Sequence, residues 1–210
     1  MCKTTTGNEI DNMNDIILSG TIKNIQHSHN IGDVEFGKAQ MVCSRDNGKE
    51  DVINLRFKSF CNPYKNNDNV SLKGNIRSYS YKTDTDSNRV MIYVFTYFDV
   101  PEDGCSEVAV IDGRICKINQ LRKTQNGKQN IHFIIANNLH SQDNTKRLNS
   151  YIPCIAWGGI AKKVMNLSVN TKIKLYGQLH SREHKKKLDN GEIEIRLAHE
   201  FVVTSFEVLE

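Results

Sequence analysis

Long apolar runs, proline and paired cysteines are scarce in this sequence. Their scarcity argues against several classes of protein. There is no run of about 18 apolar residues that would indicate a membrane-spanning helix. The polar start MCKTTTGNEIDNMND has no apolar segment typical of a secretory signal. The six cysteines form no Cys-x-x-Cys pair, so we expect free thiols, with Cys116 and Cys154 in the core, rather than disulfides or a zinc site. We therefore expect a globular protein of the cytoplasm.

The motifs of common enzyme classes are also missing. The sequence contains no P-loop, no Gly-x-Ser-x-Gly turn, no His-Glu-x-x-His helix and no acidic metal cluster. His27 and His29 form a His-x-His pair, but the spacing of the sequence places no third ligand beside them. We therefore expect no enzymatic activity, no cofactor and no metal.

Charge is distributed unevenly, although the net charge is only +4. Residues 1–105 carry 12 lysines and arginines against 14 aspartates and glutamates, a balance of −2. Residues 106–210 carry 16 against 10, a balance of +6. A basic half favours a polyanionic partner such as a nucleic acid, although ordinary soluble domains also reach this charge.

Ten segments have the alternating polarity of β-strands, five in each half of the chain. Turn residues such as Gly32-Asp33 and Asn47-Gly48 separate them. The predicted strands are 15–25, 38–44, 51–60, 69–82 and 89–100, followed by 107–118, 129–137, 150–157, 171–182 and 192–209.

The two halves repeat each other with a period of about 100 residues. Gly20 in LSGTIKNI aligns with Gly113 in IDGRICKI, and Gly74 in VSLKGNIRS aligns with Gly177 in IKLYGQLHS. Glycines at matching places within strands favour small, tightly coiled barrels, in which a strand must bend sharply.

The stretch PEDGCSE at 101–107 is typical of a linker, so we predict domains at 1–102 and 107–210. Apolar spacing predicts one helix, GGIAKKVMNLS at 158–168, between the third and fourth strands of the second half. That element order is the order of the OB-fold. We therefore predict an all-β protein of two tandem five-stranded OB-fold barrels, with one short helix in the second.

The segment YIPCIAWGG (151–159) contains the only tryptophan. Alternation turns one apolar face of this strand into the barrel and the other outward. The inner face carries Ile152, Cys154 and Ala156, and the outer face carries Tyr151, Pro153, Ile155 and Trp157. Exposed rings are costly unless something covers them, and a stacked nucleobase is one candidate. The alternative is that Trp157 packs under the helix or in a subunit interface.

Two basic hairpins are expected to flank this outer face. SREHKKKLDNGEIEIRL (181–197) contains an Asn190-Gly191 turn, and NQLRKTQNGKQN (119–130) follows the first strand of the second half. Their cations are Arg122, Lys123, Lys128, Arg182, Lys185, Lys186 and Lys187. Basic loops beside exposed rings are typical of proteins that bind single-stranded nucleic acid, although solvated surface lysines give the same pattern.

Over roughly residues 107–210 the sequence resembles the bacterial single-stranded DNA-binding protein (SSB) family. SYIPCIAWGG is similar to the family's F-I-P-C-V-A-W-G segment, and LYGQLHSRE is similar to its strand with G-x-L-x-x-R. The first half is similar only through the internal repeat and a G-x-I-x-S-x-S-Y pattern that begins at Gly74.

The resemblance implies where a DNA strand would be held. Tyr151 and Trp157 match the ring positions of the family's third strand, and His184 and Tyr81 lie where the fourth strand often carries a stacking ring. In the first half Arg56 and Lys58 replace the third-strand rings, which implies phosphate contacts there.

The resemblance also implies a function and an assembly. The expected function is binding of single-stranded DNA without sequence dependence, by base stacking and phosphate contacts, which would protect that strand in replication, recombination or repair at the nucleoid. The alternative is an OB-fold primosome or assembly adaptor that acts mainly through protein contacts. Two barrels in one chain imply a homodimer with four barrels. The family's long tail with an acidic tip, which recruits other proteins, is not expected after FEVLE, and no protein partner is indicated.

Overall fold

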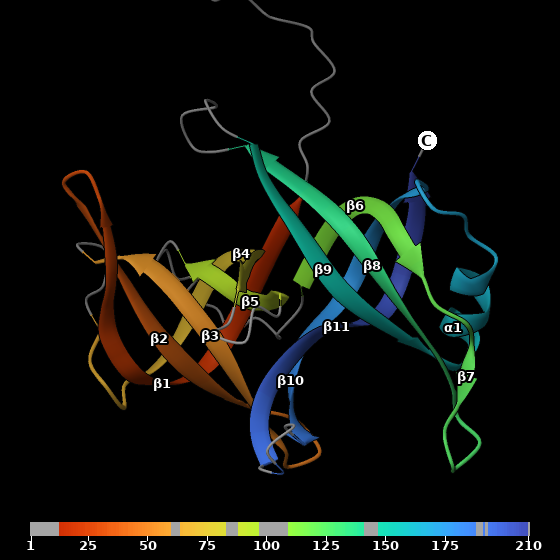
Figure 1. Ribbon diagram of the computed structural model, residues 1–210, viewed down its shortest axis with the longest axis horizontal. Helices are drawn as coiled ribbons and strands as arrows, with labels where there is room; N and C mark the ends of the chain where they lie inside the picture. Colours follow the sequence, from red (N-terminus) through yellow and green to blue (C-terminus); the bar gives the residue numbers. More distant parts are fainter. Residues whose placement is uncertain are drawn as a thin grey trace, which may run out of the picture.

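The computed structural model describes residues 13–59, 64–82, 88–96, 109–140, 147–187, 191 and 193–209. Figure 1 shows two β-barrels side by side, the first coloured red to yellow and the second green to blue. The first barrel is built from β1 (Asn14–Ile31), β2 (Val34–Ser44), β3 (Glu50–Lys58), β4 (Asn69–Lys82) and β5 (Asn88–Thr96). The second is built from β6 (Ala109–Ile118), β7 (Arg122–Lys123), β8 (Gln129–His140), β9 (Arg147–Trp157), α1 (Gly158–Met165), β10 (Lys172–Lys187) and β11 (Ile193–Leu209).

Both barrels close through the same strand order. In the first, pairing runs β1-β2-β3-β5-β4 and returns to β1, and in the second it runs β6-β8-β9-β11-β10 and returns to β6. Each barrel has one parallel pair, β3 with β5 and β9 with β11. This is the Greek-key order of the OB-fold, so the predicted fold class is confirmed. The linker at 101–107 lies outside the described residues, and the domain boundaries stay a prediction.

The repeated glycines mark places where neighbouring strands come too close for a side chain. A Cβ at Gly20 would lie only 2.2 Å from the carbonyl oxygen of Val42, and one at Gly113 would be as crowded by the backbone of β8. Gly74 and Gly177 meet the backbones of β5 and β11 in the same way. The glycines that repeat in the sequence therefore lie at equivalent close approaches of strands in the two barrels.

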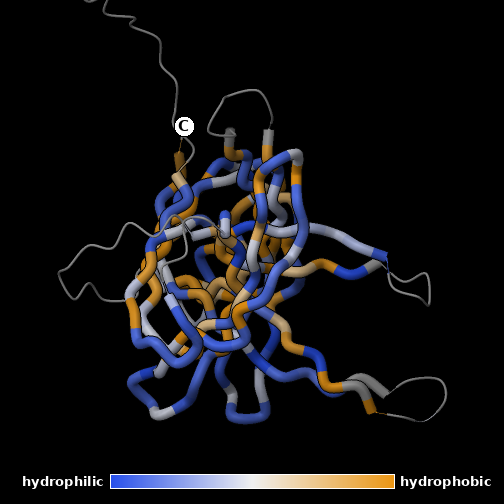
Figure 2. Tube along the Cα trace, turned by 90° about the vertical axis from the view of Figure 1, so that its left-hand side faces the viewer, coloured by the Kyte–Doolittle hydropathy of each residue, from blue (hydrophilic) through white to orange (hydrophobic). Residues whose placement is uncertain are grey.

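Each barrel is filled by the apolar side chains that alternation turns inward. Figure 2 shows these apolar residues gathered in the interior, with hydrophilic hairpin turns around them. Helix α1 lies at one end of the second barrel, where it buries Ala161 and Val164 and leaves Lys162 and Lys163 exposed. The predicted helix is thus confirmed, although it ends at Met165 instead of residue 168.

The cysteine prediction needs one correction. Cys43 and Cys154 are free and buried, and burial raises the pKa of the Cys154 thiol well above its ordinary value. Cys116, which we expected in the core, is exposed. The preceding residue Ile115 fills the barrel interior, and a register shift between Ile115 and Lys117 turns the chain outward at this point.

The two barrels are fixed to each other by a polar contact, here called the inter-barrel clamp: Arg45, Asp51, Ser181 and His199. The Asp51 carboxylate accepts hydrogen bonds from the Arg45 guanidinium and the Ser181 amide, and Arg45 Nη2 donates to the Ser181 carbonyl at 2.9 Å. His199 Nε2 donates to the Val52 carbonyl at 2.8 Å. Burial alone would raise the pKa of Asp51, but these hydrogen bonds outweigh it and hold that pKa below its ordinary value.

Three further contacts reinforce this arrangement. The β1 and β6 strands pair in antiparallel fashion, with Asn14 opposite Ile111. The buried Asn14 side chain donates to Asn137 Oδ1 of the second barrel at 2.8 Å. Beside β9, Tyr151 N donates to Ser78 Oγ of β4 at 2.7 Å. The outer surfaces of the two barrels are therefore held in a defined relation.

Candidate nucleic-acid interface

The outer face of β9 carries exposed rings at both ends. Tyr151 is 52% exposed and Trp157 is 39% exposed, whereas the inner-face residues Ile152, Cys154 and Ala156 are buried. Ile155 also lies on the outer face but is only 3% exposed, because His132 of β8 and Val202 of β11 flank it in register. The two rings are six residues apart, roughly 20 Å along a strand, so they can serve different nucleotides.

Further rings lie on β4 and β5 of the first barrel. Tyr79 lies 5.7 Å from Tyr81 and 5.8 Å from Tyr93, measured between ring centroids. Of these three only Tyr81 was predicted as a binding residue. The missed signal is alternation along β4, which places Tyr79 and Tyr81 on one outer face.

The outer face of the first barrel is cationic although its half of the chain is acidic overall. Lys38 of β2 lies opposite Arg56 of β3, and Phe36 lies opposite Lys58. The Arg77 guanidinium lies 4.2 Å from the centre of the Phe95 ring. Among the described outward positions 36–40 of β2, 54–58 of β3, 75–81 of β4 and 89–95 of β5, none is acidic. The first half of the chain thus has a negative net charge but a cationic outer face that is suited to phosphate.

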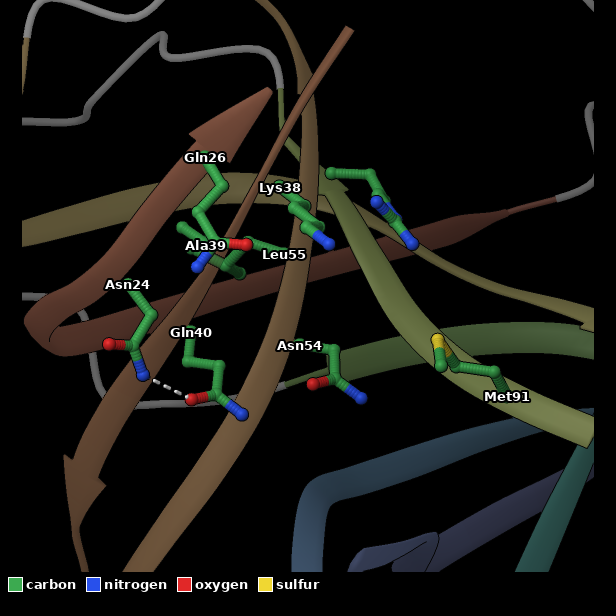
Figure 3. Close-up of a pocket in the computed structure, with 9 residues that line it drawn as sticks. Asn24, Gln26, Lys38, Ala39, Gln40, Asn54, Leu55 and Met91 are labelled. Carbon is green, nitrogen blue, oxygen red and sulfur yellow. Dashed lines mark hydrogen bonds between the residues drawn. The ribbon is translucent and has the colours of Figure 1, made fainter. Parts of the chain in front are cut away.

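Two hollows connect the outer faces of the barrels. One, of about 480 Å³, lies over β2 and β3 and is shown in Figure 3. The other, of about 320 Å³, lies between the barrels, with Tyr81 and Val90 on one side and Pro153 and Leu197 on the other. Both are lined by Asn54 and Met91, so the two hollows adjoin each other. These two adjoining hollows together are here called the groove.

Comparison with known proteins agrees with this geometry. Residues 107–208 match the model of the single-strand binding protein family. The match lies within the second barrel and its preceding segment. No similar protein was found among the curated sequences.

Solved structures reproduce both barrels. The single-stranded DNA binding protein from Thermus aquaticus matches with a TM-score of 0.69 and 13% identity, over 95% of this chain and 94% of that one. A deletion mutant of the same protein matches with a TM-score of 0.68 and 13% identity, over 95% and 96%. The protein PriB from Ralstonia solanacearum covers 50% of this chain and 100% of its own, with a TM-score of 0.39 and 10% identity, which is too weak to carry an argument. At these identities the Thermus likeness shows the fold.

The predicted cations of the second half lie on two exposed hairpins. Arg122 and Lys123 form the short β7, and Lys128 lies at the turn that leads into β8. Arg182 is exposed and lies 3.7 Å from the Glu200 carboxylate, which partly offsets its charge. Arg182 also lines the groove.

The β10–β11 hairpin, residues 181–197, is attached at its base rather than free along its whole length. Ser181 and His199 belong to the inter-barrel clamp, so the hairpin emerges beside the first barrel (Figure 1). His184 and Lys185 are exposed along it. The side chains of Lys186 and Lys187, together with Asn190, lie outside the described residues.

The side chains of His27 and His29 both make contacts within the first barrel. His27 Nε2 bonds with Asn30 Oδ1 at 2.8 Å, and the ring of His29 stacks on Phe36 with centroids 4.9 Å apart. Within the part of the chain that the structure describes, no group of three or more metal-ligating side chains occurs, and no helix is long and apolar enough to cross a membrane.

Proposed function

We propose that this protein binds single-stranded DNA along the groove, by base stacking and phosphate contacts and with little sequence dependence. The observation that carries the proposal is the groove, lined from both barrels, in a chain whose residues 107–208 match the model of the single-strand binding protein family. Its role is binding and protection of the strand during replication, recombination or repair.

The rings and the cations contribute to binding in different ways. Tyr151, Trp157 and Tyr81 offer faces on which bases of any sequence can stack, at roughly 1–3 kcal/mol per base. Arg56, Lys58 and the basic hairpins of the second barrel attract the phosphates and release counterions, which makes the affinity salt-dependent. Single strands fit this arrangement better than duplexes do, because paired bases cannot turn their faces to a protein ring.

The assembly and the location are part of the same proposal. We expect two chains to associate, which gives four barrels, and we expect the protein to act in the cytoplasm at the nucleoid. These expectations rest on the resemblance of the tandem barrels to the tandem variant of the family.

A second candidate function is that of a protein-binding adaptor. The observation that favours it is a stripe of exposed apolar side chains on one edge of the β10–β11 hairpin, formed by Ile193, Ile195 and Leu197. Such a stripe is more typical of a protein contact than of a phosphate contact.

The test is a titration of Trp157 fluorescence with oligo-dT and with a duplex of the same length, at two salt concentrations. DNA binding predicts quenching by the single strand, weak or no response to the duplex, and a steep loss of affinity at higher salt. A protein adaptor predicts no quenching at either salt concentration.

A further inference from the structure

The hollow over β2 and β3 differs chemically from the rest of the groove. Its lining contains no aromatic side chain, so a base there cannot stack on a ring. Four carboxamides line it instead, together with two cations and three apolar side chains. The carboxamides are Asn24, Gln26, Gln40 and Asn54, the cations are Lys38 and Arg56, and the apolar side chains are Ala39, Leu55 and Met91.

The floor of the hollow consists of two cross-strand pairs. Gln40 lies opposite Asn54, and Lys38 lies opposite Arg56. Like charges directly opposite on neighbouring strands destabilise a sheet. Lys38 has no ion pair or side-chain hydrogen bond within the described part of the chain, and Arg56 donates to the neutral Ser28 hydroxyl at 2.6 Å. An anion held between the two cations would relieve this repulsion.

The amide pair leaves one donor and one acceptor available. Gln40 Oε1 accepts a hydrogen bond from Asn24 at 2.8 Å, which orients its amide nitrogen away from Asn24 (Figure 3). Asn54 Nδ2 donates to the Ile92 carbonyl at 3.3 Å, which leaves its oxygen for another partner. Within the described residues no protein group bonds the Gln40 nitrogen or the Asn54 oxygen. Both residues are partly buried, so a ligand that pairs these two groups gains from their partial desolvation.

Resting on the proposed function, we propose that this hollow, here called the amide pocket, holds one adenine nucleotide of the bound strand by the edge of its base. The Asn54 oxygen accepts from the adenine amino group, the Gln40 nitrogen donates to the adjacent ring nitrogen, and the neighbouring phosphate lies between Lys38 and Arg56. Asparagine and glutamine amides are the side chains that pair with this adenine edge in proteins. The two cross-strand pairs are two residues apart along each strand, roughly 7 Å, which is the scale of one nucleotide. The protein thus combines stacking without preference in one barrel with base selection at one position in the other.

The test compares oligo-dA and oligo-dT of equal length, by titration, for the wild type and for the double variant Gln40→Leu/Asn54→Leu. Leucine matches asparagine in size, is one heavy atom smaller than glutamine, and removes the donor and the acceptor. The double variant should lose about ten-fold in affinity for oligo-dA and no more than about two-fold for oligo-dT. Asn69→Leu, on β4 and outside the groove, is the matched control and should change neither affinity.

A separate variant tests the phosphate half of the proposal. Lys38→Met should flatten the log–log salt dependence by about 0.7 for oligo-dA and oligo-dT alike, because it removes one phosphate contact and no base contact. Circular dichroism melts verify that each variant is folded. If the double variant does not fold, Gln40→Leu alone replaces it, with an expected loss of about three-fold for oligo-dA only.

Equal losses for both strands, or no loss for either, would overturn the amide pocket while the proposed function stands. A larger loss for oligo-dT than for oligo-dA would also overturn it. If the wild type binds neither strand, the proposed function itself fails, and that result is distinguishable because it does not involve a variant.

Discussion

Trp157 lies at the junction between β9 and α1. Its backbone ends β9 in an extended conformation and immediately precedes α1, while its side chain stays partly exposed on the outer face. At the other end of the strand the backbone of Tyr151 is anchored by the hydrogen bond from its amide to Ser78. The backbone that carries both rings is therefore fixed before a base arrives, which reduces the entropy lost on binding.

Trp157→Ala should weaken binding of single-stranded DNA about ten-fold or more, since stacking on a ring is worth roughly 1–3 kcal/mol per base. The measurement is fluorescence anisotropy of a labelled oligo-dT, because the variant has no tryptophan. Trp157→Phe keeps a ring and should retain most of the affinity. An unchanged affinity in a folded alanine variant would mean that this ring does not contact DNA.

His199 makes the inter-barrel clamp sensitive to acid. Burial lowers the pKa of His199 below its ordinary value, and the hydrogen bond to the Val52 carbonyl and the charge of Asp51 offset this only in part. The unfolded chain therefore binds a proton at a pH where the folded chain does not. The stability that the neutral ring contributes is present above about pH 6.5 and is lost as the pH falls below it.

The melting temperature of the wild type should accordingly fall between pH 7 and pH 5, and His199→Gln should reduce that pH dependence. Differential scanning calorimetry at a series of pH values measures both. His180, whose pKa burial and Arg45 also lower, stays in the variant and leaves a residual dependence. An identical pH dependence in the two proteins would contradict this role of His199.

At the scale of elements, alternation and turn residues were enough to predict all ten long strands, and helical apolar spacing predicted α1. The prediction held because each strand has one face in a barrel core, so apolar residues recur with period two. The two-residue β7 was missed, since so short a strand leaves no periodic signal. The attachment of the β10–β11 hairpin was missed as well, because Ser181 and Asp51 are 130 residues apart and no local pattern connects them.

Only part of the candidate site was predicted, because local patterns in the sequence mark some of its residues and not others. Family-like spacing located Tyr151 and Trp157, and charge clusters located the basic hairpins. The cationic face of the first barrel was only half found, through Arg56 and Lys58, because summing charge over the half mixes inward and outward positions. Sorting each predicted strand by alternation before counting charge would have found Lys38.

The β10–β11 hairpin should still supply much of the electrostatic attraction. Replacing Lys185, Lys186 and Lys187 by Gln should flatten the log–log salt dependence of binding by roughly 0.7–2, according to how many of the three contact phosphate. Successive strand residues point to opposite sides, so one rigid arm presents either Lys186 or its two neighbours. Titrations at several salt concentrations measure the slope.

Lys65, exposed in the turn before β4, is the control for this prediction. Lys65→Gln should leave the slope unchanged, because the turn does not line the groove. An unchanged slope in the triple variant would mean that the strand passes over the 119–130 hairpin instead.

At the scale of the whole molecule, both barrels are closed, and the inter-barrel clamp fixes their relative position. Exposed apolar side chains remain on the second barrel away from the groove, among them Met165, Val169 and Val208. Burying such side chains against a second copy would be favourable. Light scattering at micromolar concentration should therefore give twice the mass of one chain, and a monomer mass would contradict the proposed dimer.

The central claim is that one DNA strand occupies the outer faces of both barrels through the groove. Linked sites bind a long strand more tightly than either site binds a short one, because the second contact is made within the complex. The most direct measurement is quenching of Trp157 by oligo-dT of increasing length, for the wild type and for Arg56→Gln. We expect affinity to rise with length until the strand spans both barrels, and Arg56→Gln to weaken binding of long strands while leaving short strands unaffected. An affinity that does not depend on length, or an Arg56→Gln variant that matches the wild type at every length, would contradict the claim.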